Sequence, residues 1–320
     1  MMNLSERVLS ANESQTLAIA NRAKTMKSQG IDVVSLSTGE PDFPTPDCAK
    51  QAAYDAIAHN FTHYTDSNGI KELRDAVAEK FRTENGISLA NADNILITTG
   101  AKQALVNTLA AICNEGDEVI IFSPFWVSYP AMVTMTGATP IIIKTLAEHD
   151  FKPTPEQLRD ALTPQTKCVI FNSPNNPTGM MLTREEMGQL LAVLENHDCY
   201  ILSDEIYEKL TLGRIDHCSP GSFPSVAARV CTVNGVSKAF AMTGWRVGWA
   251  LGPTDVMKIT ADFLSQSTSN VTSISQKAVL AALQAGPAEL KKAVQALQAK
   301  RDRMIEKSKN FKLLRVIPPD

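Results

Sequence analysis

Short apolar runs alternate with helical patterns between residues 94 and 251, and this alternation restricts the possible fold more than any other feature. The runs are rich in Val and Ile and lack polar alternation, as is usual for strands that are covered on both faces. They are Asn94–Thr98, Glu118–Phe122, Pro140–Ile143, Cys168–Phe171, Tyr200–Ser203, Val230–Val233 and Val247–Leu251. The helical patterns between them are Lys102–Cys113, Val127–Thr136, Pro155–Leu162 and Arg184–His197. The alternation predicts an α/β fold in which helices sandwich a mostly parallel central sheet, with function at the carboxyl ends of the strands.

The segments on either side of this block predict further elements. Pro46–Asn60 and Ile70–Asn85 read as helices, and Ser35–Pro46 reads as a turn-rich loop. Pro287–Lys309 is a long charged amphipathic helix, and Lys312–Ile317 reads as a strand with no later partner. We therefore expect a large domain over residues 46–286. An incomplete smaller α+β domain would combine an N-terminal arm (1–45) with an interdomain helix and its continuation (287–320).

The composition favours a small-molecule role. The 320 residues are 44% apolar and 20% charged, and the net charge of -3 provides no positive field for nucleic acid or an anionic membrane. The six cysteines are far apart and form no CxxC pair, so the sequence predicts neither a disulfide framework nor a metal site. No signal-peptide core or membrane-spanning run is present in the sequence, so we expect a soluble, cytoplasmic protein.

Two strand ends carry groups that are costly to bury. Asp204 follows the apolar run Cys199–Leu202, where a carboxylate needs a positive partner, although a lone Asp there is more often a helix cap. Lys238 follows Thr232–Gly235 in apolar surroundings. Desolvation lowers the pKa of a lysine and prepares its amine for Schiff-base chemistry, whereas the plain alternative is a surface lysine.

Neighbouring strand ends add groups that suit a flat, anionic ligand. Gly100-Ala101-Lys102 opens a helix, where free N–H groups favour an anion, although such a motif is often only a tight turn. Trp126 offers a flat ring, Asn176 lies in rigid turn chemistry, and Arg246 offers a fork suited to phosphate.

Taken together, these motifs resemble those of the class I/II aminotransferases of the pyridoxal-phosphate fold-type I superfamily, and within it the bacterial aspartate aminotransferases. The resemblance rests on seven segments in order along nearly the whole chain. They are SLSTGEPDFPTP, HYTDSNGIKELR, TTGAKQAL, SPFWVSYP, NSPNNPTG, SDEIY and NGVSKAFAMTGWRVG. Each segment alone is weak to moderate evidence, but their joint specificity is very high.

The resemblance implies pyridoxal 5'-phosphate as the cofactor. It assigns Lys238 as the residue that holds the cofactor as a Schiff base and later moves a proton, and Asp204 as the partner of the pyridine nitrogen. Tyr207 would act with them, hydrogen-bonding the ring's phenolate oxygen together with Asn176. Other residues would hold the ring face or the phosphate, namely Trp126 for the face and Gly100, Ala101, Lys102, Ser237 and Arg246 for the phosphate end.

The same resemblance implies substrates and an assembly. Gly39 would present its backbone N–H to the substrate carboxylate, and Lys102 would meet the distal carboxylate of a dicarboxylic substrate, with Trp126 and Asn176 alongside. Aspartate and 2-oxoglutarate are therefore the expected pair, with broader or aromatic transamination second. Tyr64 would reach the phosphate of a second subunit, which implies a homodimer with shared sites.

The chain departs from the family pattern after Asp320. Family members continue into more of the small domain, which carries an arginine that clamps the substrate α-carboxylate. Because a bidentate arginine gives orientation as well as affinity, we expect this chain to capture cofactor but to bind amino acids weakly. Three alternatives remain open: a truncated, weakly active relative, another fold-type I reaction such as a β-lyase or decarboxylase, and a non-enzymatic cofactor-binding module.

Overall fold

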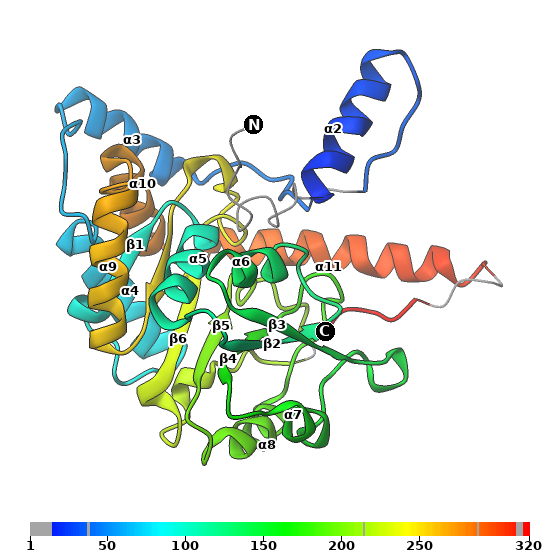
Figure 1. The fold of residues 1–320 in the computed structure, drawn as a ribbon. Coiled ribbons are helices and arrows are strands. Elements are labelled where there is room, and N and C mark those ends of the chain that lie inside the picture. The colour runs from blue at the N-terminus through cyan, green and yellow to red at the C-terminus, as the bar shows by residue number, and fades with distance from the viewer. Residues whose placement is uncertain (1–14, 37–38, 214, 287, 312–315) are drawn as a thin grey trace, which may run out of the picture.

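The computed structural model describes residues 15–36, 39–213, 215–286, 288–311 and 316–320, and a seven-stranded sheet forms its centre (Figure 1). The strand order is β1-β7-β6-β5-β4-β2-β3. The strands are β1 (Ile95–Thr98), β2 (Glu118–Ser123), β3 (Thr139–Lys144), β4 (Thr166–Asn172), β5 (Tyr200–Asp204), β6 (Val230–Gly235) and β7 (Gly248–Leu251). All seven predicted strands are confirmed, and their ends differ from the prediction by no more than two residues.

The sheet is mostly parallel, as predicted, with β7 as its exception. Strands β3, β2, β4, β5 and β6 pair in parallel, whereas β7 is antiparallel to both β6 and β1. Because β7 runs in the opposite direction, its first residue, Gly248, lies at the edge where the parallel strands end. The chain from Lys238 to Arg246 therefore returns along this edge instead of crossing a face of the sheet.

Helices cover both faces of the sheet and its β1 end. They are α2 (Gln15–Ser28), α3 (Asp47–Ala58), α4 (Lys71–Glu84), α5 (Ala101–Ile112), α6 (Tyr129–Met135), α7 (Pro155–Ala161), α8 (Arg184–Leu194), α9 (Thr254–Ser267), α10 (Ser273–Gln284) and α11 (Ala288–Ser308). In Figure 1, α2 projects away from the main body, and α11 extends along its right-hand side. The helices α2, α9 and α10 were not predicted.

Alternate residues of the strands enter two different cores. Val119 and Ile121 of β2 pack with α5 and α6, whereas Ile120 and Phe122 pack with α8 on the other face. A third core joins α3, α4 and α10 to the β1–β7 end, with Trp249 at its centre. Covering both faces explains why the strand sequences are apolar without alternation.

Helix α8 ends three residues before the predicted boundary at His197. The Arg229 guanidinium donates to the carbonyl of Leu194 at 2.6 Å, and it also bonds the carbonyl of His197. A distant side chain therefore satisfies the carbonyls that the helix leaves free at its end. No local pattern in residues 184–197 indicates this partner.

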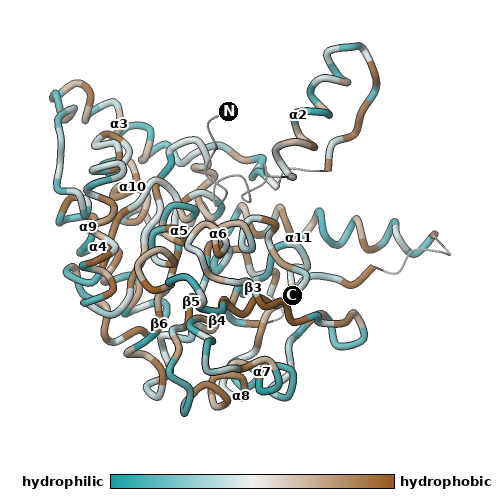
Figure 2. The backbone as a smooth tube through the Cα atoms, viewed as in Figure 1, coloured by the Kyte–Doolittle hydropathy of each residue, from teal (hydrophilic) through white to brown (hydrophobic). Residues whose placement is uncertain are grey.

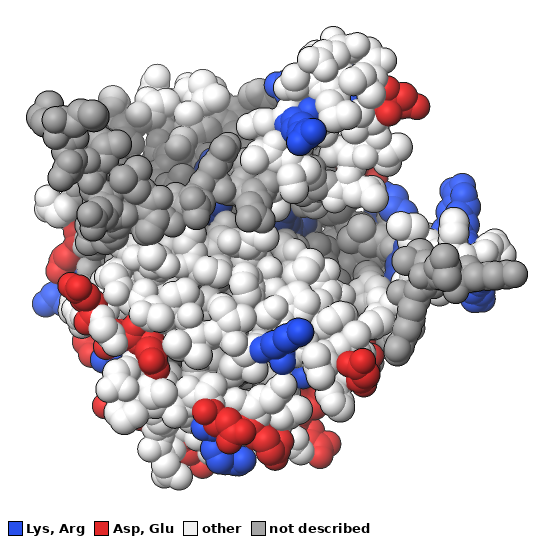
Figure 3. Space-filling model, turned by 45° about the vertical axis from the view of Figure 1, so that its right-hand side comes forward, with Lys and Arg blue, Asp and Glu red and all other residues white. Residues whose placement is uncertain are grey.

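Helix α11 and the surface carry polar and charged residues, as expected where a protein faces water. Helix α11 alternates between polar and apolar residues along its length (Figure 2), as predicted for an amphipathic helix. On the face shown in Figure 3, acidic and basic side chains are interspersed along the lower edge. None of the described helices is long and apolar enough to cross a membrane. Of the predicted strand Lys312–Ile317, residues 312–315 lie outside the described part, and Val316 and Ile317 belong to no regular element.

Candidate active site

The predicted functional residues gather at one edge of the sheet. Strands β2, β4, β5 and β6 end at this edge, β1 leads from it into α5, and β7 begins there. Asp204 therefore ends a parallel strand, and Trp126, Asn176 and Lys238 follow the ends of others. The strand order places residues that are far apart in the sequence at neighbouring positions.

Lys238 lies just beyond β6, and its side chain is partly buried. Its Nζ donates to the carbonyl oxygen of Gly39 at 2.7 Å and lies 5.9 Å from the centre of the Tyr207 ring. Burial lowers the pKa of Lys238, and the Arg246 charge adds to this shift while the Glu40 carboxylate opposes it. A lysine whose charged form is disfavoured provides the neutral amine that adds to a carbonyl carbon.

Asp204 ends β5, and only 3% of it is exposed. Its Oδ2 accepts a hydrogen bond of 2.7 Å from the Tyr129 hydroxyl, and its Oδ1 accepts one of 3.2 Å from the Ile206 N–H. Burial raises the pKa of Asp204 to about 6, although both hydrogen bonds oppose the rise. None of the described cations lies within ion-pair distance of this carboxylate, so it can receive a positive partner from a ligand.

Tyr207 and Asn176 form a pair beside Lys238. The Asn176 amide donates to the Tyr207 hydroxyl at 3.2 Å, and the Asn176 backbone N–H is held by Asn172 Oδ1 at 2.8 Å. Burial raises the pKa of Tyr207 to about 12, so its hydroxyl stays protonated. The pair can therefore offer two hydrogen-bond donors to one anionic oxygen.

The start of α5 forms an anion site with Arg246. Gly100 precedes the helix at φ 78°, and no described acceptor meets the N–H groups of Ala101 and Lys102. Arg246 approaches so closely that a Cβ on Gly100 would lie 2.7 Å from its Nη2. Gly248 of β7 packs underneath, where a Cβ would lie 2.4 Å from the Ala101 nitrogen. Free helix N–H groups and a guanidinium are the donors that a phosphate prefers.

Lys102 and Trp126 complete one wall of the site. Lys102 Nζ lies 4.9 Å from the centre of the Trp126 ring, and Trp126 meets Tyr129 edge to face at 5.5 Å. Partial burial lowers the pKa of Lys102, and the Arg246 charge contributes to this shift. Two cations thus share one place with no carboxylate within ion-pair distance among the described residues, an arrangement that favours an anionic ligand.

Three predicted residues are placed less decisively. Ser237 is buried next to Lys238, and Gly39 meets Lys238 through its carbonyl oxygen. Tyr64 is 92% exposed in the loop between α3 and α4. Sequence reasoning missed Tyr129, whose only signal is its position three residues after Trp126. Its partner Asp204 is 75 residues away, so no local pattern reveals the contact.

The arrangement suits a flat ring that carries a phosphate, a basic ring nitrogen and a carbonyl carbon. The anion site would take the phosphate, Asp204 would face the nitrogen, and Lys238 would face the carbonyl carbon. This fit rests on Asp204, Lys102 and Arg246. These side chains are buried or crowded, and none has a counter-ion within ion-pair distance among the described residues.

Comparison with known proteins gives consistent results. The family model described as "Aminotransferase class I and II" matches residues 31–319. The aspartate/prephenate aminotransferase of Thermus thermophilus is 46% identical over 96% of this chain and 79% of its own length. The aspartate aminotransferase of Geobacillus stearothermophilus is 46% identical over 90% of this chain and 73% of its own length.

Solved structures show the same likeness. The structure of aspartate aminotransferase from Thermus thermophilus with maleate has a TM-score of 0.96 and 45% identity, and it covers 100% of this chain and 83% of its own. The structure of the aspartate aminotransferase from Rhizobium meliloti has a TM-score of 0.95 and 40% identity, with 100% and 81% covered. The described fold is therefore that of these enzymes.

Proposed function

Because this chain belongs to the class I and II aminotransferases, which depend on pyridoxal 5'-phosphate, we propose that it transfers the amino group of L-aspartate to 2-oxoglutarate. The observation that carries this proposal is the pair of cations, Lys102 beside Trp126 and Arg246 close to it, neither of which has a carboxylate within ion-pair distance among the described residues. One cation suits the cofactor phosphate, and the other remains for a second carboxylate of the substrate.

Different residues of the site would bind different parts of the cofactor. Gly100, Ala101, Ser237 and Arg246 would hold the phosphate, and Trp126 would cover the ring face. Tyr207 and Asn176 would bind the phenolate oxygen with the two donors described above. When bound, the cofactor supplies an electron sink for the bond between the substrate Cα and its proton.

Lys238 has two roles in this proposal. Its amine, with a lowered pKa, would attach the cofactor, and its Nζ, when free, would take the proton from the substrate Cα and deliver it to the former carbonyl carbon of the cofactor. The Gly39 carbonyl that now accepts from Nζ shows where the amine can rest, 2.7 Å away. The same side chain therefore serves binding and proton transfer.

Asp204 would keep the ring nitrogen protonated. The cofactor nitrogen brings the positive partner that this buried carboxylate lacks, and Tyr129 holds Oδ2 so that the carboxylate keeps one orientation. We assign Tyr129 as a positioning residue because it contacts Asp204 and the edge of Trp126.

Exposed and buried groups support a proposal on assembly and compartment. We propose a homodimer in which Tyr64, 92% exposed here, reaches the phosphate of the other subunit. All six cysteines are free, and all but Cys48 are buried, which suits a reduced compartment such as the cytoplasm.

Transamination can be tested by mixing the purified protein with L-aspartate, 2-oxoglutarate and cofactor. We expect glutamate and oxaloacetate in equal amounts, with no ammonia or carbon dioxide beyond the spontaneous decay of oxaloacetate measured without protein. Release of ammonia or carbon dioxide in place of glutamate would instead indicate a lyase or a decarboxylase.

A second acceptor deserves the same assay. The relative from Thermus thermophilus is named for aspartate and prephenate. Prephenate also carries a second carboxylate, so Lys102 can serve both acceptors. Comparing kcat/KM for prephenate and 2-oxoglutarate ranks them.

A further inference from the structure

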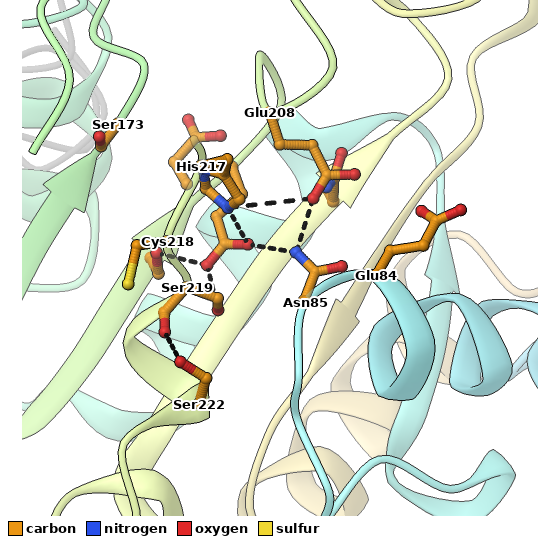
Figure 4. Close-up of polar contacts among 12 residues, drawn as sticks. Glu84, Asn85, Ser173, Glu208, His217, Cys218, Ser219 and Ser222 are labelled. Atoms are coloured by element: carbon orange, nitrogen blue, oxygen red, sulfur yellow. Dashed lines mark hydrogen bonds and ion pairs between the residues drawn. The ribbon is translucent and has the colours of Figure 1, made fainter. Parts of the chain in front are cut away.

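A buried polar network lies directly behind the Asp204 turn and includes no residue assigned to the site. It consists of Glu205, Glu208, His217, Asn85 and Lys80 (Figure 4). None of Glu205 is exposed, and Glu208 is 7% exposed. The network joins the C-terminal end of α4 to the segment that follows β5.

Glu205 has every lone-pair direction occupied. Its Oε1 accepts from the hydroxyls of Ser203 at 2.9 Å and Ser219 at 2.6 Å. Its Oε2 accepts from the Asn85 amide at 3.0 Å and lies 3.0 Å from His217 Nε2. His217 is the one described side chain in contact with Glu205 that can carry a positive charge.

Glu208 is tied to the same amide. Its Oε1 pairs with the Lys80 ammonium, and its Oε2 accepts from Asn85 at 2.6 Å. Lys80 also donates to Asn85 Oδ1 at 2.7 Å. The grouping of two glutamates and a histidine could suit a metal ion by residue type, but each carboxylate oxygen already has a donor. A metal would have to displace Lys80 and Asn85.

The network and the active site share one short segment. Asp204 turns toward Tyr129, whereas Glu205 turns toward Ser219 and His217. Tyr207 meets Asn176, and its neighbour Glu208 meets Lys80. Asp204 is the last residue of the extended strand β5, so the next side chain, Glu205, points to the opposite side. Residues 206–209 form a turn, from which Tyr207 and Glu208 reach their separate partners. The side chains behind the segment therefore fix its position for those in front.

From this geometry, we infer that the Glu205–His217 pair positions the turn that carries Asp204 and Tyr207 and that its charge balance sets how strongly Asp204 and the cofactor ring nitrogen retain their shared proton. The inference rests on the role proposed above for Asp204. Glu205 and His217 contact the side of the segment that faces away from the site, so they would act through Asp204.

The signs of the charges make the inference specific. The Glu205 charge adds to the burial that raises the pKa of Asp204, so Glu205 favours retention of a proton nearby. Burial lowers the pKa of His217, but Glu205 and then Glu208 outweigh it and raise the pKa, while Lys80 opposes them. A protonated His217, whose Nε2 lies 3.0 Å from Glu205 Oε2, offsets part of the Glu205 charge.

Three variants separate this role from simple stabilisation. Glu205→Gln keeps the shape and removes the negative charge, and His217→Gln removes the positive one. As a control, Asn94→Leu removes a buried side chain that bonds Leu89 and Asn91, at the opposite end of β1 from the site. All three should lower the unfolding temperature.

The readout is the 15N chemical shift of the ring nitrogen, measured with 15N-labelled cofactor, together with cofactor affinity of the apo protein. We expect Glu205→Gln to shift the nitrogen toward its unprotonated value and to weaken cofactor binding by about threefold to tenfold. His217→Gln should leave the nitrogen as protonated as in the wild type or more so, and Asn94→Leu should leave both readouts unchanged.

Asp204→Asn serves as the reference for the role on which the inference rests. If this variant does not change the nitrogen shift, the proposed function of Asp204 is wrong. If Asp204→Asn changes the shift but Glu205→Gln does not, or if both network variants move it in the same direction, the inference about the Glu205–His217 pair is wrong.

Discussion

Two buried polar regions meet at the end of β5, and they differ in how completely their charges are paired. In the network of Glu205, Glu208, His217, Asn85 and Lys80, every carboxylate oxygen has a donor. At the sheet edge, Asp204 has no described cation within ion-pair distance, and Lys102 and Arg246 have no described carboxylate. Burying the charges of either region is unfavourable. Among the described residues, only those of the network offset this desolvation with partners from the same chain.

The difference indicates which region is built for a ligand. A saturated network stabilises one conformation, whereas an unsaturated set gains its partners when a ligand of opposite charges binds. The pKa directions agree: burial raises the pKa of Asp204 to about 6, whereas the charges of Lys80, His217 and Lys209 together outweigh burial and lower the pKa of Glu208 to about 2. Substitutions at the edge should therefore change chemistry directly, and those in the network should change stability and affect the site only through Asp204.

The largest effect is expected for Lys238→Ala. If one amine both attaches the cofactor and moves the proton, as proposed, transamination should fall by about 10⁴-fold or more, while the unfolding temperature of the apo protein stays close to wild type. Borohydride reduction of the wild type followed by peptide mapping should place the label on Lys238. A label on another lysine would contradict the assignment.

Asp204→Asn should leave cofactor bound but slow the half-reaction with L-aspartate. A neutral amide cannot hold the ring nitrogen protonated, so the loss should be about 10²- to 10³-fold. Stopped-flow absorbance measures this step directly. Rates near wild type would refute the electrostatic role. Asp204 would then act mainly on stability, like the residues of the saturated network.

Glu208→Gln should act on stability and on its pH dependence. The variant removes the close partner of the buried Lys80 and leaves it only the partly exposed Glu84, at 3.9 Å, so the free energy of unfolding at pH 7 should fall by about 3 kcal/mol. In the wild type, Glu208 has a pKa of about 2 when folded and an ordinary value near 4.5 when unfolded, so its contribution is lost as the pH falls from 4.5 to 2. Urea unfolding of the apo protein between pH 7 and 3 should show the difference between variant and wild type narrowing with acid.

Asp204 should give the opposite slope in the same experiment. Its folded pKa of about 6 exceeds the ordinary 3.8, so its contribution to the free energy of unfolding decreases as the pH rises from 3.8 to 6. Comparing Glu208→Gln with Asp204→Asn separates the two slopes. Equal slopes in both variants would mean that the two regions are not electrostatically distinct.

Tyr129→Phe tests the hydrogen bond that orients Asp204. The hydroxyl favours the ionised carboxylate, so its loss should raise the pKa of Asp204 further above its ordinary value and weaken cofactor binding by about tenfold. The acid limb of cofactor capture by the apo protein should move to higher pH. An unchanged limb would show that Tyr129 only packs against Trp126.

The smallest effect is expected for Lys102→Ala, and it is one of selectivity. Only dicarboxylic substrates offer a distal charge, so kcat/KM for aspartate should fall about tenfold relative to that for alanine. Arg246 stays in place to hold the phosphate. An equal loss for both substrates would make Lys102 a phosphate-site residue instead.

The sequence predicted the parts of this molecule that have local signals. Seven apolar runs indicated the strands, and the polar residues after them indicated the edge where Asp204 and Lys238 lie. The direction of β7 was not predictable, because an apolar run such as Val247–Leu251 reads the same in both directions. Helix α10 was missed because its buried face includes Ser273, Ser275 and Gln276, which are polar in sequence but buried in the fold.

The contacts that depend on distant residues could not be predicted. Asn85 reaches Glu205 across 120 residues, and Tyr129 reaches Asp204 across 75. The motif Ser203–Tyr207 showed that both carboxylates exist, but only the fold shows that one is saturated and the other is not. The roles assigned to individual residues remain predictions, because neither the fold nor the relatives test them.

Gly248 sets how closely β7 approaches the first turn of α5, beneath the proposed phosphate site. Its α-carbon hydrogen occupies the place where any side chain would meet the Ala101 nitrogen at 2.4 Å, and on the neighbouring strand a Cβ on Gly235 would lie 2.9 Å from the Gly248 Cα. The spacing between β7 and the first turn of α5 is therefore that of bare backbone. Since Arg246 leads into β7 and Ala101 opens α5, this spacing fixes the width of the gap that an anion must span between them, and even one methyl group would widen it.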